Sequence, residues 1–282
     1  MSDKQKGILA ITASALAFTV MAVFIKEAGD LPAYQKSLFR NIISMLFVGS
    51  LLIKNNLKVS SITNYRLLII RSTLGTVGII ANFYAVDHLA LADANIINRL
   101  STFFVIIFSF IFLKEKASYK QLFAVLLAFV GAGIVIRPEF NIEFIPYLIA
   151  IIGAICAGGA YTVLRALGGK EHPLLVVFFF SAFSTVILLP VVILNYQAMT
   201  MYQLGSLILA GIFATLGQFG VTFAYKFAPA SQISIYNFSG VIFSALFGFI
   251  IFGQSPELIN YIGYSIIFAA SFYMFVDKQK QA

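Results

Sequence analysis

Apolar residues fill most of the chain in ten long runs, and each run is separated from the next by a short polar stretch. Each run is roughly 20 residues long, the length that an α-helix needs to cross the hydrocarbon core of a bilayer. We expect membrane-spanning helices over residues 7–25, 35–53, 67–86, 93–112, 120–136, 146–164, 174–194, 203–224, 232–252 and 258–275. The pattern therefore predicts an all-α membrane protein with ten transmembrane helices.

The first five runs resemble the second five at a constant offset of 139 residues. At this offset Asn98 aligns with Asn237 and Gly78 aligns with Gly217, and no gap is needed. Because five is an odd number, the second set must cross the membrane in the opposite direction. We therefore expect two inverted five-helix repeats, at residues 1–140 and 141–282. Many secondary transporters use inverted repeats for alternating access.

The composition agrees with a membrane protein. Hydrophobic residues make up 60% of the 282 residues and charged residues only 11%, whereas soluble domains carry about 25% charged residues. Ten spans leave no length for a soluble catalytic or nucleotide-binding domain. The single Cys156 lies inside an apolar run, so the sequence contains no disulfide framework.

The net charge of +8 is explained by orientation and not by nucleic-acid binding, because the basic residues gather on one side of the predicted membrane. With the N-terminus inside, thirteen Lys and Arg residues lie in inner loops or tails, and only Lys26, Lys36 and Arg137 lie outside. Cytoplasmic loops are enriched in Lys and Arg. We expect both termini in the cytoplasm, in a bacterial inner membrane.

Several local patterns accompany the five-plus-five layout. They are Lys26 and Arg165 at the ends of the first and sixth spans, Phe39-Arg40, the stretch 85–94, the stretch 112–116, and the stretch 131–136. In this order they resemble the EamA-type branch of the drug/metabolite transporter superfamily over essentially the whole chain. The resemblance implies a central cavity lined by spans one to four and six to nine, with spans five and ten at the periphery.

Polar side chains inside a bilayer are costly and usually face a bundle interior or a cavity. Asn95, Asn98, Arg99 and Thr102 share one face of the fourth span by helical spacing. We expect substrate-binding residues at Arg40, Asn82, Asn98, Arg99, Thr102, Tyr161, Gln218, Tyr236 and Asn237. The alternative for each of these residues is hydrogen bonding or packing between helices.

The three arginines inside the predicted spans give the strongest indication of the charge of the substrate. A guanidinium is always charged and its planar fork suits a carboxylate or phosphate. Arg40 and Arg99 are deep, whereas Arg71 lies one turn inside its span and is expected to reach the inner interface. Asp93 lies at the rim of the fourth span, where it could cap the helix or neutralise Arg99. A positive interior without deep acids favours a substrate that carries an anionic group.

We expect a secondary transporter of a small polar metabolite, an amino acid or another zwitterionic or anionic organic solute. The alternative within the superfamily is a multidrug or toxic-cation exporter, which the missing deep carboxylate disfavours. A channel and a membrane-embedded enzyme are the other classes considered. The sequence contains no His-Glu-x-x-His, no Gly-x-Ser-x-Gly and no P-loop motif, and His88 and His172 both fall in predicted loops, so we expect no catalytic residue, metal site or cofactor. The expected partners are the small-molecule substrate and the lipid bilayer, and the oligomeric state is left open.

Overall fold

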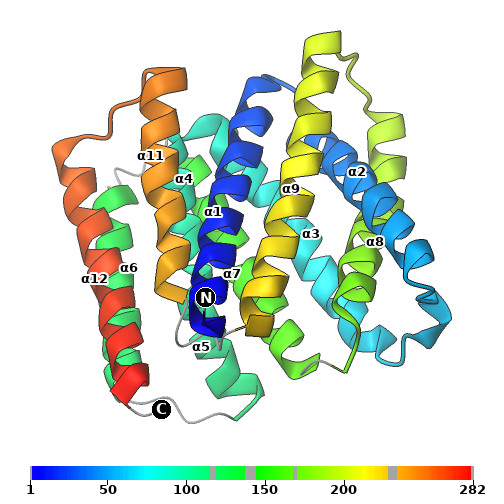
Figure 1. Ribbon diagram of the computed structural model, residues 1–282. Coiled ribbons are helices and arrows are strands. Elements are labelled where there is room, and N and C mark those ends of the chain that lie inside the picture. Colours follow the sequence, from blue (N-terminus) through cyan, green and yellow to red (C-terminus); the bar gives the residue numbers. More distant parts are fainter. Residues whose placement is uncertain (1, 115–118, 137–143, 168–169, 228–233, 281–282) are drawn as a thin grey trace.

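The protein is a bundle of helices, and the structure, a computed structural model, describes residues 2–114, 119–136, 144–167, 170–227 and 234–280 (Figure 1). Within these ranges there is no β-strand. The first half contains α1 (Asp3–Glu27), α2 (Ala33–Lys54), the short 3₁₀ helix η1 (Val59–Ser61), α3 (Tyr65–His88), α4 (Leu91–Arg99), α5 (Ser101–Phe112) and α6 (Tyr119–Ile136). The second half contains α7 (Ile145–Leu167), α8 (Pro173–Leu194), α9 (Met201–Phe227), the 3₁₀ helix η3 (Ser234–Phe238), α11 (Ser239–Phe252) and α12 (Leu258–Lys280).

These elements confirm the predicted ten spans. Seven apolar segments of 21 to 24 residues are long enough to cross a membrane, and α4 together with α5 forms one of them, Leu91–Phe112. Three shorter apolar helices, Leu122–Val135, Tyr236–Phe252 and Leu258–Ala270, complete the set. The protein is thus an all-α membrane protein with two inverted five-helix repeats. The predicted boundary at residue 140 falls in the stretch 137–143, outside the described residues.

The fourth and ninth spans are not continuous α-helices, which the sequence pattern did not predict. The α-helical pattern stops between Arg99 and Ser101, where Leu100 ends α4 and precedes α5. In the second repeat the 3₁₀ turn η3 ends at Phe238 and α11 begins at Ser239. Leu100 corresponds to Ser239 at the offset of 139 residues, so the two repeats break the same span within one residue of the same place. Interrupted helices at corresponding positions are typical of transporter binding sites.

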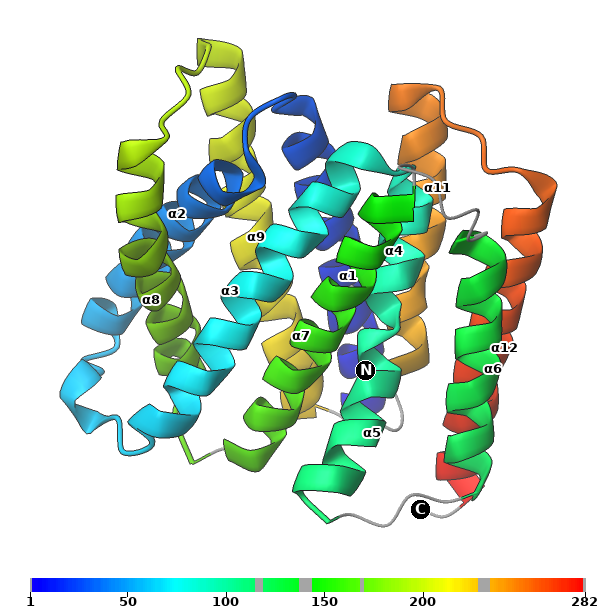
Figure 2. The ribbon, with the colours of Figure 1, turned by 180° about the vertical axis from the view of Figure 1, so that it is seen from behind.

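Helix pairing follows the repeat symmetry. The largest helix contacts join α1 to α9 and α3 to α7, and α2 packs on α8, α4 on α11 and α6 on α12. At the repeat offset α7 corresponds to α1 and α9 to α3, so the first two contacts are symmetry equivalents. Figure 2 shows α3 and α7 side by side on the near face of the bundle, with α6 and α12 together at its edge. The arrangement confirms the peripheral position expected for spans five and ten.

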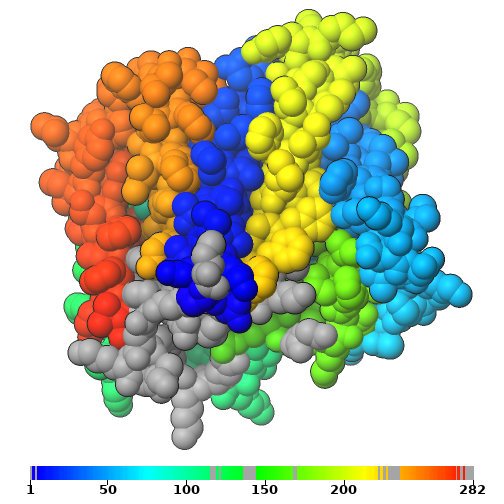
Figure 3. All heavy atoms as spheres, viewed as in Figure 1, coloured from blue at the N-terminus to red at the C-terminus, as the bar shows by residue number. Residues whose placement is uncertain are grey.

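Two glycines allow the close approach of the paired helices. A Cβ on Gly217 of α9 would lie 2.8 Å from the ring of Phe18 in α1, and a Cβ on Gly78 of α3 would lie 3.3 Å from the backbone of α7. Ser14 of α1 also donates a hydrogen bond of 2.6 Å to the carbonyl oxygen of Gly217. The side chains of α1 and α9 meet along their shared boundary in the space-filling view (Figure 3). Small residues at helix interfaces serve such packing in membranes.

Candidate functional site

A cavity of about 150 Å³ lies between the two repeats. Its described walls come from α1, α2, α3 and α4 of the first repeat and from α7, α8, α9 and η3 of the second, and none of them comes from α6 or α12. The polar side chains on these walls are Arg40, Arg71, Asn82, Asn95, Asn98, Arg99, Tyr161, Gln218 and Asn237. Seven of the nine residues that the sequence analysis proposed therefore line one cavity, and their role in binding stays a prediction.

Arg40 on α2 lies almost fully inside the protein, with 2% of its surface exposed. Its Nη1 donates a hydrogen bond of 2.7 Å to Oδ1 of Asn41, and Nδ2 of Asn41 donates one of 2.8 Å to the carbonyl oxygen of Ser37. Nε of Arg40 has no hydrogen-bond partner among the described residues. Asn41 thus orients one edge of the guanidinium and leaves the other edge available to a ligand. Sequence reasoning did not identify Asn41.

Arg71 does not extend to the interface, so that expectation was wrong. The side chain is 7% exposed, and its guanidinium carbon lies 4.0 Å from the centre of the Phe180 ring of α8. Arg71, Gly75, Gly78 and Asn82 all line the cavity, at spacings of four, three and four residues that place them on one helix face. Gly75 brings α3 close to Phe180, because a Cβ there would lie 2.8 Å from the ring. This spacing was the signal that could have identified Arg71.

Three residues of the fourth span line the cavity, namely Asn95, Asn98 and Arg99 of α4, whereas Thr102 does not. The predicted common face assumes one continuous helix, and the interruption at Leu100 separates Thr102 from the other three. Nδ2 of Asn95 donates a hydrogen bond of 2.6 Å to Oγ of Ser244 on α11. A Cβ on Gly240 of α11 would lie 2.4 Å from Nη2 of Arg99. The two interrupted spans are therefore packed directly against each other beside the cavity.

The second repeat contributes Tyr161 of α7, Gln218 of α9 and Asn237 of η3. Oδ1 of Asn237 is buried and has no hydrogen-bond partner in the described parts of the chain. Tyr236 does not line the cavity and is 37% exposed. A 3₁₀ helix has three residues per turn, so neighbouring side chains on η3 point in directions about 120° apart. Asn98 and its repeat equivalent Asn237 thus lie on the walls of the same cavity.

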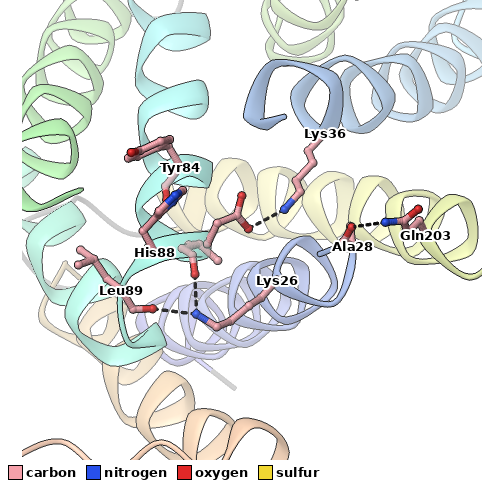
Figure 4. Close-up of polar contacts among 9 residues, drawn as sticks. Lys26, Ala28, Lys36, Tyr84, His88, Leu89 and Gln203 are labelled. Atoms are coloured by element: carbon pink, nitrogen blue, oxygen red, sulfur yellow. Dashed lines mark hydrogen bonds and ion pairs between the residues drawn. The ribbon is translucent and has the colours of Figure 1, made fainter. Parts of the chain in front are cut away.

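A second polar cluster joins the end of α1 and the start of α2 to the end of α3. Nζ of Lys26 donates to the carbonyl oxygens of Val86 and Leu89, at 2.8 Å each, and Nζ of Lys36 lies 2.6 Å from Oδ1 of Asp87. Figure 4 shows both lysine side chains reaching toward the end of α3. The sequence analysis counted both lysines only as charges on the outer side of the membrane and did not predict that Lys36 is fully buried.

Two further expectations on polar residues need correction. Asp93 does not cap α4, because it is buried and accepts hydrogen bonds from Tyr264 and Asn260 of α12. No ion pair with Arg99 occurs in the described part of the chain, so Asp93 attaches α4 to the peripheral helix pair. His88 is not in a loop but ends α3, where its ring stacks on Tyr84 with centres 4.0 Å apart.

The charge of the cavity is one-sided. Arg40, Arg71 and Arg99 line it, and no Asp or Glu is found among its described lining residues. Within the described residues there is also no group of three His, Cys, Asp or Glu side chains that could hold a metal ion. The remaining polar groups are neutral amides and one phenol, which can accept or donate hydrogen bonds. Such a site can bind an anionic organic molecule and orient it.

The chain resembles known transport proteins. The sequence profile of the EamA-like transporter family matches residues 5–137 and 144–276. The pseudopaline exporter CntI of Pseudomonas aeruginosa is 28% identical over 269 residues, which cover 94% of each chain. The riboflavin transporter of Brucella anthropi is 24% identical, covering 94% of this chain and 96% of that one, and solute carrier family 35 member G1 of Mus musculus is 29% identical, covering 89% and 73%.

The fold also occurs among solved structures. One crystal structure superposes with a TM-score of 0.73 at 13% sequence identity and covers 98% of this chain and 99% of its own. At this identity the likeness concerns the fold alone. Taken with the two family matches and the cavity between the two halves, it leads to one assignment: this chain is a member of the EamA-like transporter family.

Proposed function

We propose that the protein is a secondary transporter that moves a small polar metabolite across a bacterial inner membrane by alternating access. The substrate is an amino acid or another zwitterionic or anionic organic solute, and it binds in the cavity between the repeats. Both termini are cytoplasmic in this proposal, as the distribution of Lys and Arg favours. The observation that carries the proposal is the cavity itself, to which both repeats contribute polar side chains.

The repeat geometry supports alternating access. The contacts of α1 with α9 and of α3 with α7 are equivalent under the repeat offset, and both are formed by small residues that allow close backbone approach. In inverted-repeat transporters, one arrangement of the bundle converts to the opposite one when the repeats exchange conformations around a fixed site. The paired breaks at Leu100 and Ser239 lie next to Asn98 and Asn237, where such a site is expected.

The cavity does not favour the alternative of a toxic-cation exporter. A cationic substrate would meet three guanidinium groups and, within the described walls, no carboxylate. Like charges in a site of low dielectric repel each other strongly. The Pseudomonas relative is named a pseudopaline exporter and the Brucella relative a riboflavin transporter, which supports an organic solute as the substrate of this chain.

Counterflow in proteoliposomes tests the proposal. Vesicles that contain the purified protein are loaded with a mixture of unlabelled amino acids and organic acids, and uptake of each labelled solute is measured from outside. A carrier gives transient, saturable accumulation of at least one solute, whereas a channel gives uptake that does not saturate. Asn98→Ala and Asn237→Ala should reduce the uptake, and Ser265→Ala on α12, which does not line the cavity, is the matched control. Absence of counterflow for every solute would contradict the proposal.

A further inference from the structure

We propose that Arg40 and Arg71 together bind the carboxylate of the transported solute, at the end of the cavity that α2, α3 and α8 form. This inference rests on the proposed transport function and names the residues that recognise the anionic group of the substrate. Figures 1 and 2 both show α2 and α8 on the opposite side of the bundle from α4 and α11. The arginine pair is therefore separate from the wall that Asn95 and Asn98 of α4 line.

This end of the cavity contains two buried N–H donors that no described residue satisfies. Nε of Arg40 and Nη1 of Arg71 lack a hydrogen-bond partner among the described residues, and the two side chains are only 2% and 7% exposed. Both residues line the cavity, whose described walls include no Asp or Glu. Leaving a buried donor without a partner is costly, and a guanidinium stays protonated. An anionic acceptor that enters the cavity would satisfy both donors.

Two neighbouring side chains hold the guanidinium groups in place. The guanidinium carbons of Arg40 and Arg71 lie 5.8 Å and 4.0 Å from the centre of the Phe180 ring. Nη1 of Arg40 donates a hydrogen bond of 2.7 Å to Oδ1 of Asn41. The ring attracts the two cations but accepts no conventional hydrogen bond from them, and the amide of Asn41 is neutral. Both neighbours thus position the arginines without supplying a counter-charge.

A carboxylate is the group that matches this pair of arginines. Each of its two oxygens can accept a charge-assisted hydrogen bond, one from each guanidinium. The cavity volume of about 150 Å³ is small beside the roughly 300–1,000 Å³ typical of ligand pockets, so the acid is short. Asn82 of α3 and Tyr161 of α7 line the same cavity and can bind a hydroxyl or an amino group. The substrate class is therefore a short carboxylic acid that carries a hydroxyl or an amino group.

The test removes the charge of the ligand and keeps its shape. Binding of lactate, glycerate, alanine and serine to the purified protein is measured by calorimetry beside binding of their primary amides, in which NH₂ replaces one carboxylate oxygen. We expect at least one of these acids to bind tenfold or more tightly than its amide. Methyl phosphate is the probe for a phosphate site and should bind more weakly than that acid.

Two variants connect this preference to the arginine pair. Arg71→Gln removes one guanidinium, so the preference for the acid over its amide should fall to about threefold or less. Asn41→Asp keeps the size of the side chain and places a competing carboxylate beside Arg40. In this variant the acid should bind at least tenfold more weakly, while binding of the amide should change by threefold or less.

Each variant has a matched control on the same helix. Arg66→Gln lies on the exposed first turn of α3, and Asn55→Asp lies at the exposed end of α2. Both controls should bind acid and amide as the unchanged protein does. If Arg71→Gln does not fold, Asn41→Asp and the ligand pairs with the unchanged protein still decide the question.

The outcomes separate this inference from the transport function. The inference is overturned if no acid binds, if every acid binds no more tightly than its amide, or if methyl phosphate binds more tightly than every acid. It is also overturned if either variant, once folded, keeps the full preference. In those cases, counterflow of any solute would leave the proposed function standing. Tight binding of an acid without counterflow of any solute would refute transport and retain the carboxylate site.

Discussion

The guanidinium of Arg71 lies 4.0 Å from the centre of the Phe180 ring, and Arg40 approaches the same ring at 5.8 Å. The ring of Phe180, from the second repeat, therefore makes cation–π contacts with two buried arginines of the first repeat. A cation–π contact that is shielded from water contributes about 2 kcal/mol. The Phe180 ring thus stabilises the two positively charged guanidinium groups, which lie beside each other on the cavity wall.

Replacing this ring should destabilise the protein through the arginines. Phe180→Leu keeps an apolar side chain but loses the ring, so we expect the free energy of unfolding in detergent to fall by about 2–3 kcal/mol. In an Arg71→Gln background the same change should cost about 1 kcal/mol less, as a double-mutant cycle would show. Phe178→Leu on the same helix is the control and should cost the same in both backgrounds. Additive costs for Phe180 and Arg71 would contradict the interaction.

Arg99 should act through its planar fork as well as its charge. Arg99→Lys keeps the charge and loses the fork, so substrate binding should weaken while the protein stays folded. Arg99→Ala should weaken it further, by about 1.5–3 kcal/mol. Gly240→Ala should also weaken binding, because its Cβ would lie 2.4 Å from Nη2 of Arg99 and would push the guanidinium aside. Unchanged affinity with lowered thermal stability would assign Arg99 a structural role only.

Much of the fold could be predicted because the bilayer imposes one strong rule. A backbone inside lipid must satisfy its own hydrogen bonds, so apolar runs of sufficient length become helices. The predicted span 35–53 corresponds to α2, Ala33–Lys54, and the span 174–194 to α8, Pro173–Leu194. The breaks at Leu100 and Ser239 have no such signal, because neither position holds a proline or glycine. Beside these breaks α4 and α11 pack against each other through residues far apart in sequence, and a single sequence does not reveal such contacts.

From the sequence, site residues could be predicted only where a polar residue stands inside a long apolar run. Asn98, Asn237 and Arg40 are deep polar residues in apolar runs, and all three line the cavity. Arg71 was misplaced because its distance from the helix start suggested access to water, whereas a ring from another helix holds it. The positions of Lys36 and Asp93 depend on partners far away in sequence, Asp87 and Tyr264. Composition and spacing carry no information about such pairs.

The orientation of the chain can be tested by cysteine labelling. In a Cys156→Ala background, Ser60→Cys places a thiol in the exposed segment after α2, and Ser255→Cys places one in the exposed segment before α12. With cytoplasmic termini, a membrane-impermeant maleimide should label Ser255→Cys in intact cells and Ser60→Cys only after the cells are opened. The reverse pattern would show that the proposed orientation is wrong.

Glu171 should make stability depend on pH in the acid range. Its Oε1 accepts hydrogen bonds from the backbone and side chains of Thr63 and Asn64 at 2.8–3.0 Å. These bonds, that from the Asn64 side chain above all, lower the pKa of the carboxyl from 4.5 to about 2, although burial opposes the shift. Because the folded pKa is the lower one, the stabilisation is complete above pH 4.5 and is lost as the pH falls through about 2.

Glu171→Gln provides the comparison for this pH effect. The glutamine still offers one oxygen but no charge, so the variant should be less stable at pH 7 by about 1–2 kcal/mol. The difference in unfolding midpoint between the two proteins should shrink between pH 4.5 and pH 2. A difference that stays constant over the whole range would contradict the assigned pKa.

The buried ion pair of Lys36 and Asp87 should matter far more to stability than an exposed one. Lys36 has no exposed surface and Asp87 is 16% exposed, whereas the Lys6–Asp3 pair is 44% and 71% exposed. Asp87→Asn leaves an ammonium buried without its counter-charge, so we expect a loss of about 3–5 kcal/mol in the free energy of unfolding. Asp3→Asn should cost less than about 1 kcal/mol.

The double replacement Lys36→Met with Asp87→Leu should recover most of the loss in the free energy of unfolding, since two apolar side chains leave no charge buried without a counter-charge. Chemical denaturation in detergent measures all three variants. If Asp87→Asn costs no more than Asp3→Asn, the pair does not hold α2 against the end of α3.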